Sequence, residues 1–129
     1  MKISKEQRAA IGETVMKLER DFYGRGPSSI RVSVSDSAPE VITVLSVDSL
    51  TAADRTLVER GMVGSVTRHH QVLHNATADD FCAEVGSVIG QKPDAYLAQV
   101  DAHTGYAVRV FVFTDGLETL NDGTAGQAP

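Results

Sequence analysis

The sequence predicts a small α+β domain with the element order α-β-β-α-α-β-β, in which a four-stranded antiparallel sheet carries its helices mainly on one face. Three observations predict this class: helix-capping signals ahead of segments with helical periodicity, alternation of apolar and polar residues in other segments, and short turns between paired segments. The 129 residues suffice for one domain. We place it at residues 1–114 and expect a flexible tail, rich in Gly, Asp and Thr, at residues 115–129.

The first helix is expected to begin after Ser4, because Gln7 completes a capping box with it. Apolar residues then follow at helical spacing and predict one buried stripe: Ile11, Val15, Leu18 and Phe22. The two glycines and the proline of the loop Tyr23-Gly24-Arg25-Gly26-Pro27 end this helix. The loop therefore separates the first helix from the first strand.

A hairpin follows the loop. Ile30, Val32 and Val34 alternate with polar residues, which is typical of a half-buried strand. Residues 36–40 have the composition of a turn. The next segment, residues 41–47, is apolar on both of its faces, so we expect it in the interior of the sheet.

Two helices are expected after the first hairpin. Thr51 begins one of them, with Asp54 at the capping-box position. Its apolar face is predicted to run through Val58, Met62, Val66, His69, Leu73 and Ala76. Thr77 is then predicted to begin a third helix that Gly90 ends.

The second hairpin joins a strand at residues 95–101 to a last strand at residues 106–114. The last strand has two different sides: Val108, Val110 and Val112 face one way, and Ala107, Arg109, Phe111 and Phe113 face the other. If the second side is buried, Arg109 needs a carboxylate partner or a ligand. If it is exposed, its phenylalanines form a contact patch.

Composition limits the possible functions. The net charge of −5 argues against general binding of nucleic acid or of anionic lipid, since both need an excess of Lys and Arg. The single cysteine, Cys82, cannot form an internal disulfide, which favours a reducing compartment and a cytoplasmic protein. No apolar run reaches the length of a membrane span, so we expect no direct membrane insertion.

The loop after the first helix is the first candidate site. Gly24 and Gly26 permit positive φ and leave backbone N–H groups accessible, and the guanidinium of Arg25 offers a fork of donors. Together with Tyr23, these groups suit a small anion such as bicarbonate, phosphate or a nucleotide. The alternative is a plain helix stop in which Arg25 pairs with an acidic neighbour.

Other candidates are weaker. His70 and His74 share a helical face at a spacing that can ligate a metal, but no third ligand follows at motif spacing, so we expect neither a metal nor a cofactor. Asp101 and His103 in the second hairpin turn form a possible acid–base pair, although turns favour Asp for backbone bonding alone. Cys82 is interpreted as a packed structural thiol.

Three stretches carry a family resemblance: Leu18–Pro27, Ser49–Leu57 and Val108–Phe113. On these the chain resembles the MpsC-type family, which is associated with a sodium-translocating, membrane-potential-generating system. The resemblance covers residues 3–114, and Tyr-Gly-Arg-Gly-Pro is its most specific element. It implies a small cytosolic protein linked to ion or inorganic-carbon handling at the membrane. It supplies no catalytic residues.

The leading hypothesis is a non-catalytic accessory or regulatory protein that binds a partner, such as a membrane transport protein, and forms a homodimer through a free sheet edge. The second is a sensor of small anions that uses Arg25. The third is an enzyme, which would need a pocket holding at least two residues of one set: Arg25, His69, Asp101, His103 and Arg109.

Overall fold

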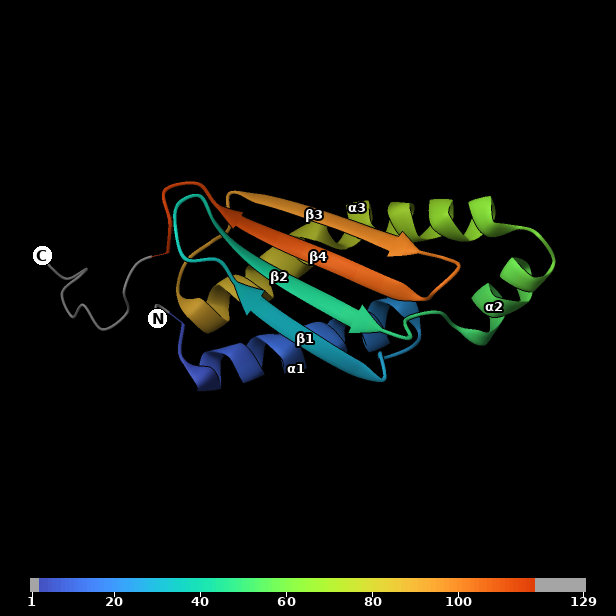
Figure 1. Cartoon of the computed structure of the whole chain (residues 1–129), viewed down its shortest axis with the longest axis horizontal. Coiled ribbons are helices and arrows are strands. Elements are labelled where there is room, and N and C mark those ends of the chain that lie inside the picture. Colours follow the sequence, from blue (N-terminus) through green and yellow to red (C-terminus); the bar gives the residue numbers. More distant parts are fainter. Residues whose placement is uncertain (1–2, 118–129) are drawn as a thin grey trace, which may run out of the picture.

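The computed structural model describes residues 3–117. Its elements follow the predicted order: α1 (Lys5–Tyr23), β1 (Ser29–Val34), β2 (Glu40–Val47), α2 (Ala52–Glu59), α3 (Val63–Ile89), β3 (Ala95–Asp101) and β4 (Tyr106–Phe113). The strands form one antiparallel sheet in the order β1-β2-β4-β3. Helices α1 and α3 lie against one face of it, and α2 extends from one end (Figure 1). The predicted fold class is confirmed.

Helix α1 has the predicted ends. Ser4 and Gln7 form both hydrogen bonds of the capping box, and Gly24 closes the helix with a left-handed φ of 84°. Three residues of the predicted stripe are buried, but Phe22 is 40% exposed. Glu19 and Tyr23 are buried in its place, because the packed side of α1 follows an i, i+4 line from Ile11.

The interior position of β2 is confirmed, since it pairs with β1 on one side and β4 on the other. The two sides of β4 also differ as expected. Arg109, Phe111 and Phe113 are buried beneath the helices, so the phenylalanines form no surface patch. Arg109 therefore falls under the buried alternative, in which it needs a partner.

The predicted boundary between the second and third helices is wrong. The chain breaks at Arg60–Met62, where Gly61 has a φ of 80°, and α3 then continues through Thr77. The Thr77 hydroxyl does not cap a new helix, because it donates to the Leu73 carbonyl oxygen at 2.7 Å within α3. Residues before and after Gly61 thus belong to two different helix axes.

The main core lies between the sheet and helices α1 and α3: Ile3, Ile11, Val15, Leu18, Tyr23, Ile42, Val44, Phe81, Val85, Ile89, Phe111, Phe113 and Leu117. Leu117 joins this core although it follows residue 114, where we expected the tail to begin. Its backbone N–H donates to Glu40 Oε1 at 2.6 Å. The rest of the predicted tail, residues 118–129, lies outside the described residues.

Candidate functional site

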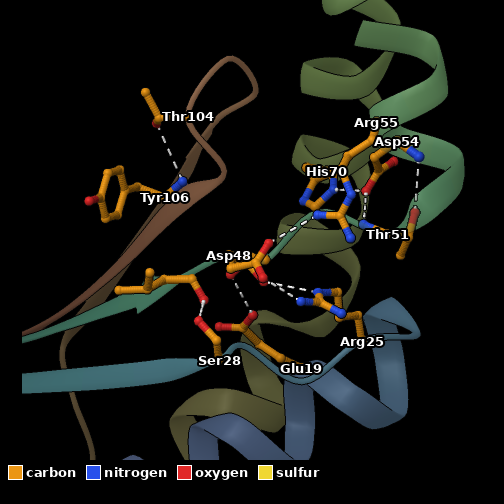
Figure 2. A network of polar contacts seen from close by, with 12 residues as sticks. Glu19, Arg25, Ser28, Asp48, Thr51, Asp54, Arg55, His70, Thr104 and Tyr106 are labelled. Carbon is orange, nitrogen blue, oxygen red and sulfur yellow. Dashed lines mark hydrogen bonds and ion pairs between the residues drawn. The ribbon is translucent and has the colours of Figure 1, made fainter. Parts of the chain in front are cut away.

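The centre of the helix-covered face holds a buried ion pair. Arg109 Nη1 on β4 donates to Glu19 Oε2 on α1 at 2.6 Å, and these residues are 1% and 2% exposed. The hydroxyls of Ser46 and Ser49 also donate to the Glu19 carboxylate (Figure 2 shows Glu19). Several donors therefore compensate the loss of water around Glu19.

Aromatic rings complete the surroundings of Arg109. Its Nε donates to the Tyr96 hydroxyl at 3.1 Å, and its guanidinium carbon lies 4.4 Å from the centroid of the Phe81 ring and 5.1 Å from that of Tyr23. Burial opposes the charge, but the interactions with Glu19, Tyr96 and Tyr23 together outweigh it and raise the pKa of Arg109. The expected carboxylate partner of Arg109 is thus present.

A second contact joins α1 to α3. The Tyr23 hydroxyl lies 2.6 Å from His74 Nδ1, and His74 is only 2% exposed. Burial first, and then the charges of Arg109 and His70, lower the pKa of His74 to about 4. His74 is therefore neutral at pH 7. Its Nε2 is buried without a hydrogen-bond partner among the described residues.

The next pair, His70 and Asp54, lies at the N-terminal end of α2. His70 Nε2 is 3.0 Å from Asp54 Oδ2, which also accepts the backbone N–H of Thr51 (Figure 2). Burial would raise the pKa of Asp54, but the hydrogen bonds from His70 and Thr51 outweigh it and lower the pKa. Asp54 is therefore an ionised carboxylate, of which only 7% is exposed.

The structure corrects the predicted position of His69 on α3. His70 and His74 are buried, whereas His69, which we placed on the apolar face, is exposed. The predicted stripe and the buried line share Val66, but the prediction then stepped three residues to His69, whereas the buried line steps four residues to His70. The buried line instead runs through Val66, His70, His74, Thr77 and Phe81.

A pocket of about 410 Å³ opens beside these pairs, where α1, α2 and α3 meet. It is lined by Tyr23, Thr51, Ala53, Asp54, Leu57, His69, His70 and Leu73. Of the five residues that our enzyme hypothesis required, only His69 lines it. Asp101 and His103 are exposed at the β3–β4 turn, where Asp101 accepts the Thr104 hydroxyl at 2.7 Å. The structure therefore does not bring that set together.

The loop after α1 divides between the interior and the surface. Tyr23 points into the buried network, whereas Arg25 binds Asp48 through its Nε, at 3.0 Å from the carbonyl oxygen, and its Nη2, at 2.5 Å from Oδ2. Arg55 binds the other oxygen of Asp48 at 3.0 Å (Figure 2). The hydrogen bond from Arg25 is the main cause of the lowered pKa of Asp48. Arg25 thus pairs with an acidic neighbour, and anion binding by this loop remains a prediction.

Two further candidates offer little chemistry. Within residues 3–117, no three side chains of His, Cys, Asp or Glu converge as a metal site. His70 and His74 are instead bound to Asp54 and Tyr23. Burial, and then the charge of Asp79, raises the pKa of the half-buried Cys82 thiol, which makes its reactive thiolate rarer.

The other face of the sheet presents a contrasting surface, which we call the open face. No helix of the described part of the chain covers it (Figure 1). Strands β2, β4 and β3 contribute Val41, Thr43, Leu45, Val47, Tyr106, Val108, Val110, Val112, Ala95, Leu97, Gln99 and Asp101. Leu97 and Tyr106 are the most exposed large side chains of this set, at 60% and 46%. Ser29, Arg31 and Ser33 of β1 form its polar border.

A family profile described as Na+-translocating membrane potential-generating system (MpsC) matches residues 4–115. The chain belongs to the MpsC family. This match covers the ion pair, the loop after α1, the pocket and the open face of the MpsC chain alike. Comparison with curated proteins gave no match, and comparison with solved structures gave none either. Between residues 3 and 117, no helix combines the length and apolarity needed to cross a membrane.

Proposed function

We propose that this MpsC chain is a non-catalytic accessory protein of a sodium-translocating, membrane-potential-generating system, and that it acts by docking its open face on a protein of that system. The observation that carries this proposal is the apolar open face itself. The family description supports the choice of system.

The size of the open face supports a role in protein contact. Three neighbouring strands at a spacing of about 4.8 Å, each contributing about 20 Å of length, present roughly 300 Å². A patch of that size lies at the lower end of the range of about 300–600 Å² found for the largest apolar patch of a typical soluble monomer, and such patches are often functional. A partner that covers it and its border would approach the area of a small specific interface.

Charged residues at the border of the open face indicate which charges the partner surface carries. Arg31 lies on the β1 side of the open face, and Asp101 lies at the end of β3 on the opposite side. The partner surface is therefore apolar at its centre, with an acidic group facing Arg31 and a basic group facing Asp101. Such opposed charges fix orientation more than they add affinity.

The polar groups support a non-catalytic role, because they are engaged with one another. Arg109 is bound by Glu19, and Arg25 by Asp48. In the pocket, Asp54 is likewise engaged with the Nε2 atom of His70 at 3.0 Å.

A matched pair of variants tests the proposal. Val110→Lys places a charge in the open face, whereas Val72→Lys makes the same change at an exposed position of α3. The readout is the sodium-dependent membrane potential, followed with a voltage-sensitive dye in cells that contain the translocating system. We expect loss of the potential without the chain or with Val110→Lys, and retention with Val72→Lys. An unchanged potential in cells lacking the chain, or with Val110→Lys, would overturn the proposal.

A further inference from the structure

The outer edge of β1 presents backbone groups that β2 does not use. Ser35 N–H donates to the Val41 carbonyl oxygen at 3.0 Å, and residues 29–34 of β1 pair with β2 in one unbroken antiparallel register. Hydrogen-bonded pairs alternate in such a ladder. The N–H and C=O groups of Ile30, Val32 and Val34 therefore point away from β2. No strand within residues 3–117 pairs with that edge.

Both edges of the sheet carry one side-chain hydrogen bond to an outward carbonyl oxygen, from Arg8 to Val32 on β1 at 3.5 Å and from Gln99 to Val100 on β3 at 3.2 Å. The longer one leaves the β1 edge the less protected. On β3, the carbonyl of Asp101 turns toward β4, where it accepts Gly105 N–H, so the neighbouring Val100 carbonyl points outward. The Gln99 side chain donates to that Val100 oxygen at 3.2 Å and partly blocks the edge. The β1 edge contains no proline and only one charge, Arg31. Native proteins rarely leave such an edge uncovered.

A groove of about 490 Å³ runs between the β1 edge and α1. It is lined by Lys5, Arg8, Ala9, Gly12, Glu13, Met16, Ile30, Arg31 and Val32. A Cβ atom on Gly12 would lie 3.0 Å from Ile30 Cγ2, so helix and strand are in close contact at the base of the groove. A partly apolar groove beside an open strand edge is the geometry in which an added strand binds.

We propose that the added strand is β1 of a second copy of this chain, paired antiparallel across a two-fold axis at Val32. The outward groups of Val32 then meet Val32 of the second copy, and those of Ile30 meet Val34 of the second copy. Every outward N–H and C=O of these three residues gains a backbone partner, and the Val32 carbonyl oxygen exchanges the Arg8 side chain for it. The two four-stranded sheets become one continuous sheet.

Charge supports a second copy as the occupant. In this register Arg31 lies directly opposite Ser33 of the second copy, so no like charges face each other. The groove carries both signs on α1, with Lys5 near its start and Glu13 further along. A two-fold axis sets the two α1 helices antiparallel, which brings the Lys5 end of one helix toward Glu13 of the other. This contact uses the outer edge of β1, so the apolar centre of the open face stays available to a different partner.

Engineered disulfides test the register of the proposed pairing between the two β1 strands. Residues 31 and 33 form a pair without backbone hydrogen bonds in this dimer, with Cα atoms about 4.5 Å apart, which is within disulfide range. On a Cys82→Ser background, the double variant Arg31→Cys/Ser33→Cys should form a covalent dimer on mild oxidation. Each single variant should not, because like positions do not face each other. Absence of the covalent dimer, or equally efficient dimers from a single variant, would refute the register.

Light scattering after size-exclusion chromatography tests the edge itself. Val32→Pro removes an N–H that β2 does not use, so we expect a folded chain whose dimer dissociation constant rises by about tenfold or more. Ala98→Pro makes the matched change at the β3 edge and should leave the dimer intact. A wild-type monomer at high concentration, or a dimer broken by Ala98→Pro or Val110→Lys but not by Val32→Pro, would overturn the proposal. Circular dichroism verifies that each variant is folded.

Discussion

The two faces of the sheet present different kinds of side chain, although the same strands form both. On β4, Arg109 turns toward the helices and is held by Glu19, whereas its neighbour Val110 turns toward the open face. The covered face thus contains charged groups that partners satisfy, and the open face contains apolar groups that no helix in the described chain covers. The polarity of the side chains therefore does not tell which face of the sheet is buried. What distinguishes the covered face is that its charged side chains have partners within the fold.

The largest expected effect breaks the covered face. Arg109→Met leaves the Glu19 carboxylate buried without its cation, and we expect a loss of about 3–5 kcal/mol in the free energy of unfolding. Urea denaturation measures this quantity. The double variant Glu19→Leu/Arg109→Met should recover a large part of the loss, because it removes the stranded charge as well. A single-variant loss under about 1 kcal/mol would show that the pair is not desolvated as described.

A smaller effect concerns pH. The folded chain protonates His74 only near pH 4, whereas the unfolded chain does so near 6.5. Between these values the unfolded state binds more protons, so stability falls as the pH is lowered, by up to about 3 kcal/mol. Denaturation curves between pH 7 and pH 4 measure this slope. His74→Gln should flatten it, and an equal slope in that variant would assign the effect to other groups.

The end of α1 should give an intermediate effect. Gly24 adopts a φ of 84° between Tyr23, which enters the covered face, and Arg25, which remains outside it. Gly24→Ala places a Cβ in the left-handed region at a cost of about 1 kcal/mol. Thermal denaturation measures the change. Gly64→Ala is the control, because Gly64 lies in α3 with no atom near its missing Cβ, and it should stabilise the chain or leave it unchanged.

The smallest effect on stability is expected on the open face. Val110→Lys should change the free energy of unfolding by only about 0.5 kcal/mol, because the new lysine side chain can extend into solvent. Its effect on function should be large. Phe111→Leu beneath the helices should show the opposite combination, with a larger effect on stability than on function. Chemical denaturation of both variants sharpens the contrast. A loss above about 2 kcal/mol for Val110→Lys would mean that the open face is covered within the folded chain.

Much of the fold could be predicted because its signals are local. Both capping boxes, at Ser4 and Thr51, were found at the predicted positions, as were the alternation in β4 and the interior place of β2. The helix break was misplaced because Thr77 resembles an N-cap in sequence, although within a helix its hydroxyl can bond to the preceding turn. The prediction also placed His69 on the apolar face, whereas His70 and His74 are the buried histidines of α3.

The sequence by itself determined the order of the helices and strands and that a buried Arg109 would need a carboxylate partner or a ligand. Caps, turns and periodicity act over three or four residues, so they can be read along the chain. Only the tertiary structure decided that the carboxylate belongs to Glu19, which is 90 residues away. It also paired Tyr23 with His74, engaged Arg25 with Asp48 and left one sheet face open. These outcomes depend on how the helices pack on the sheet, and no short segment encodes that packing.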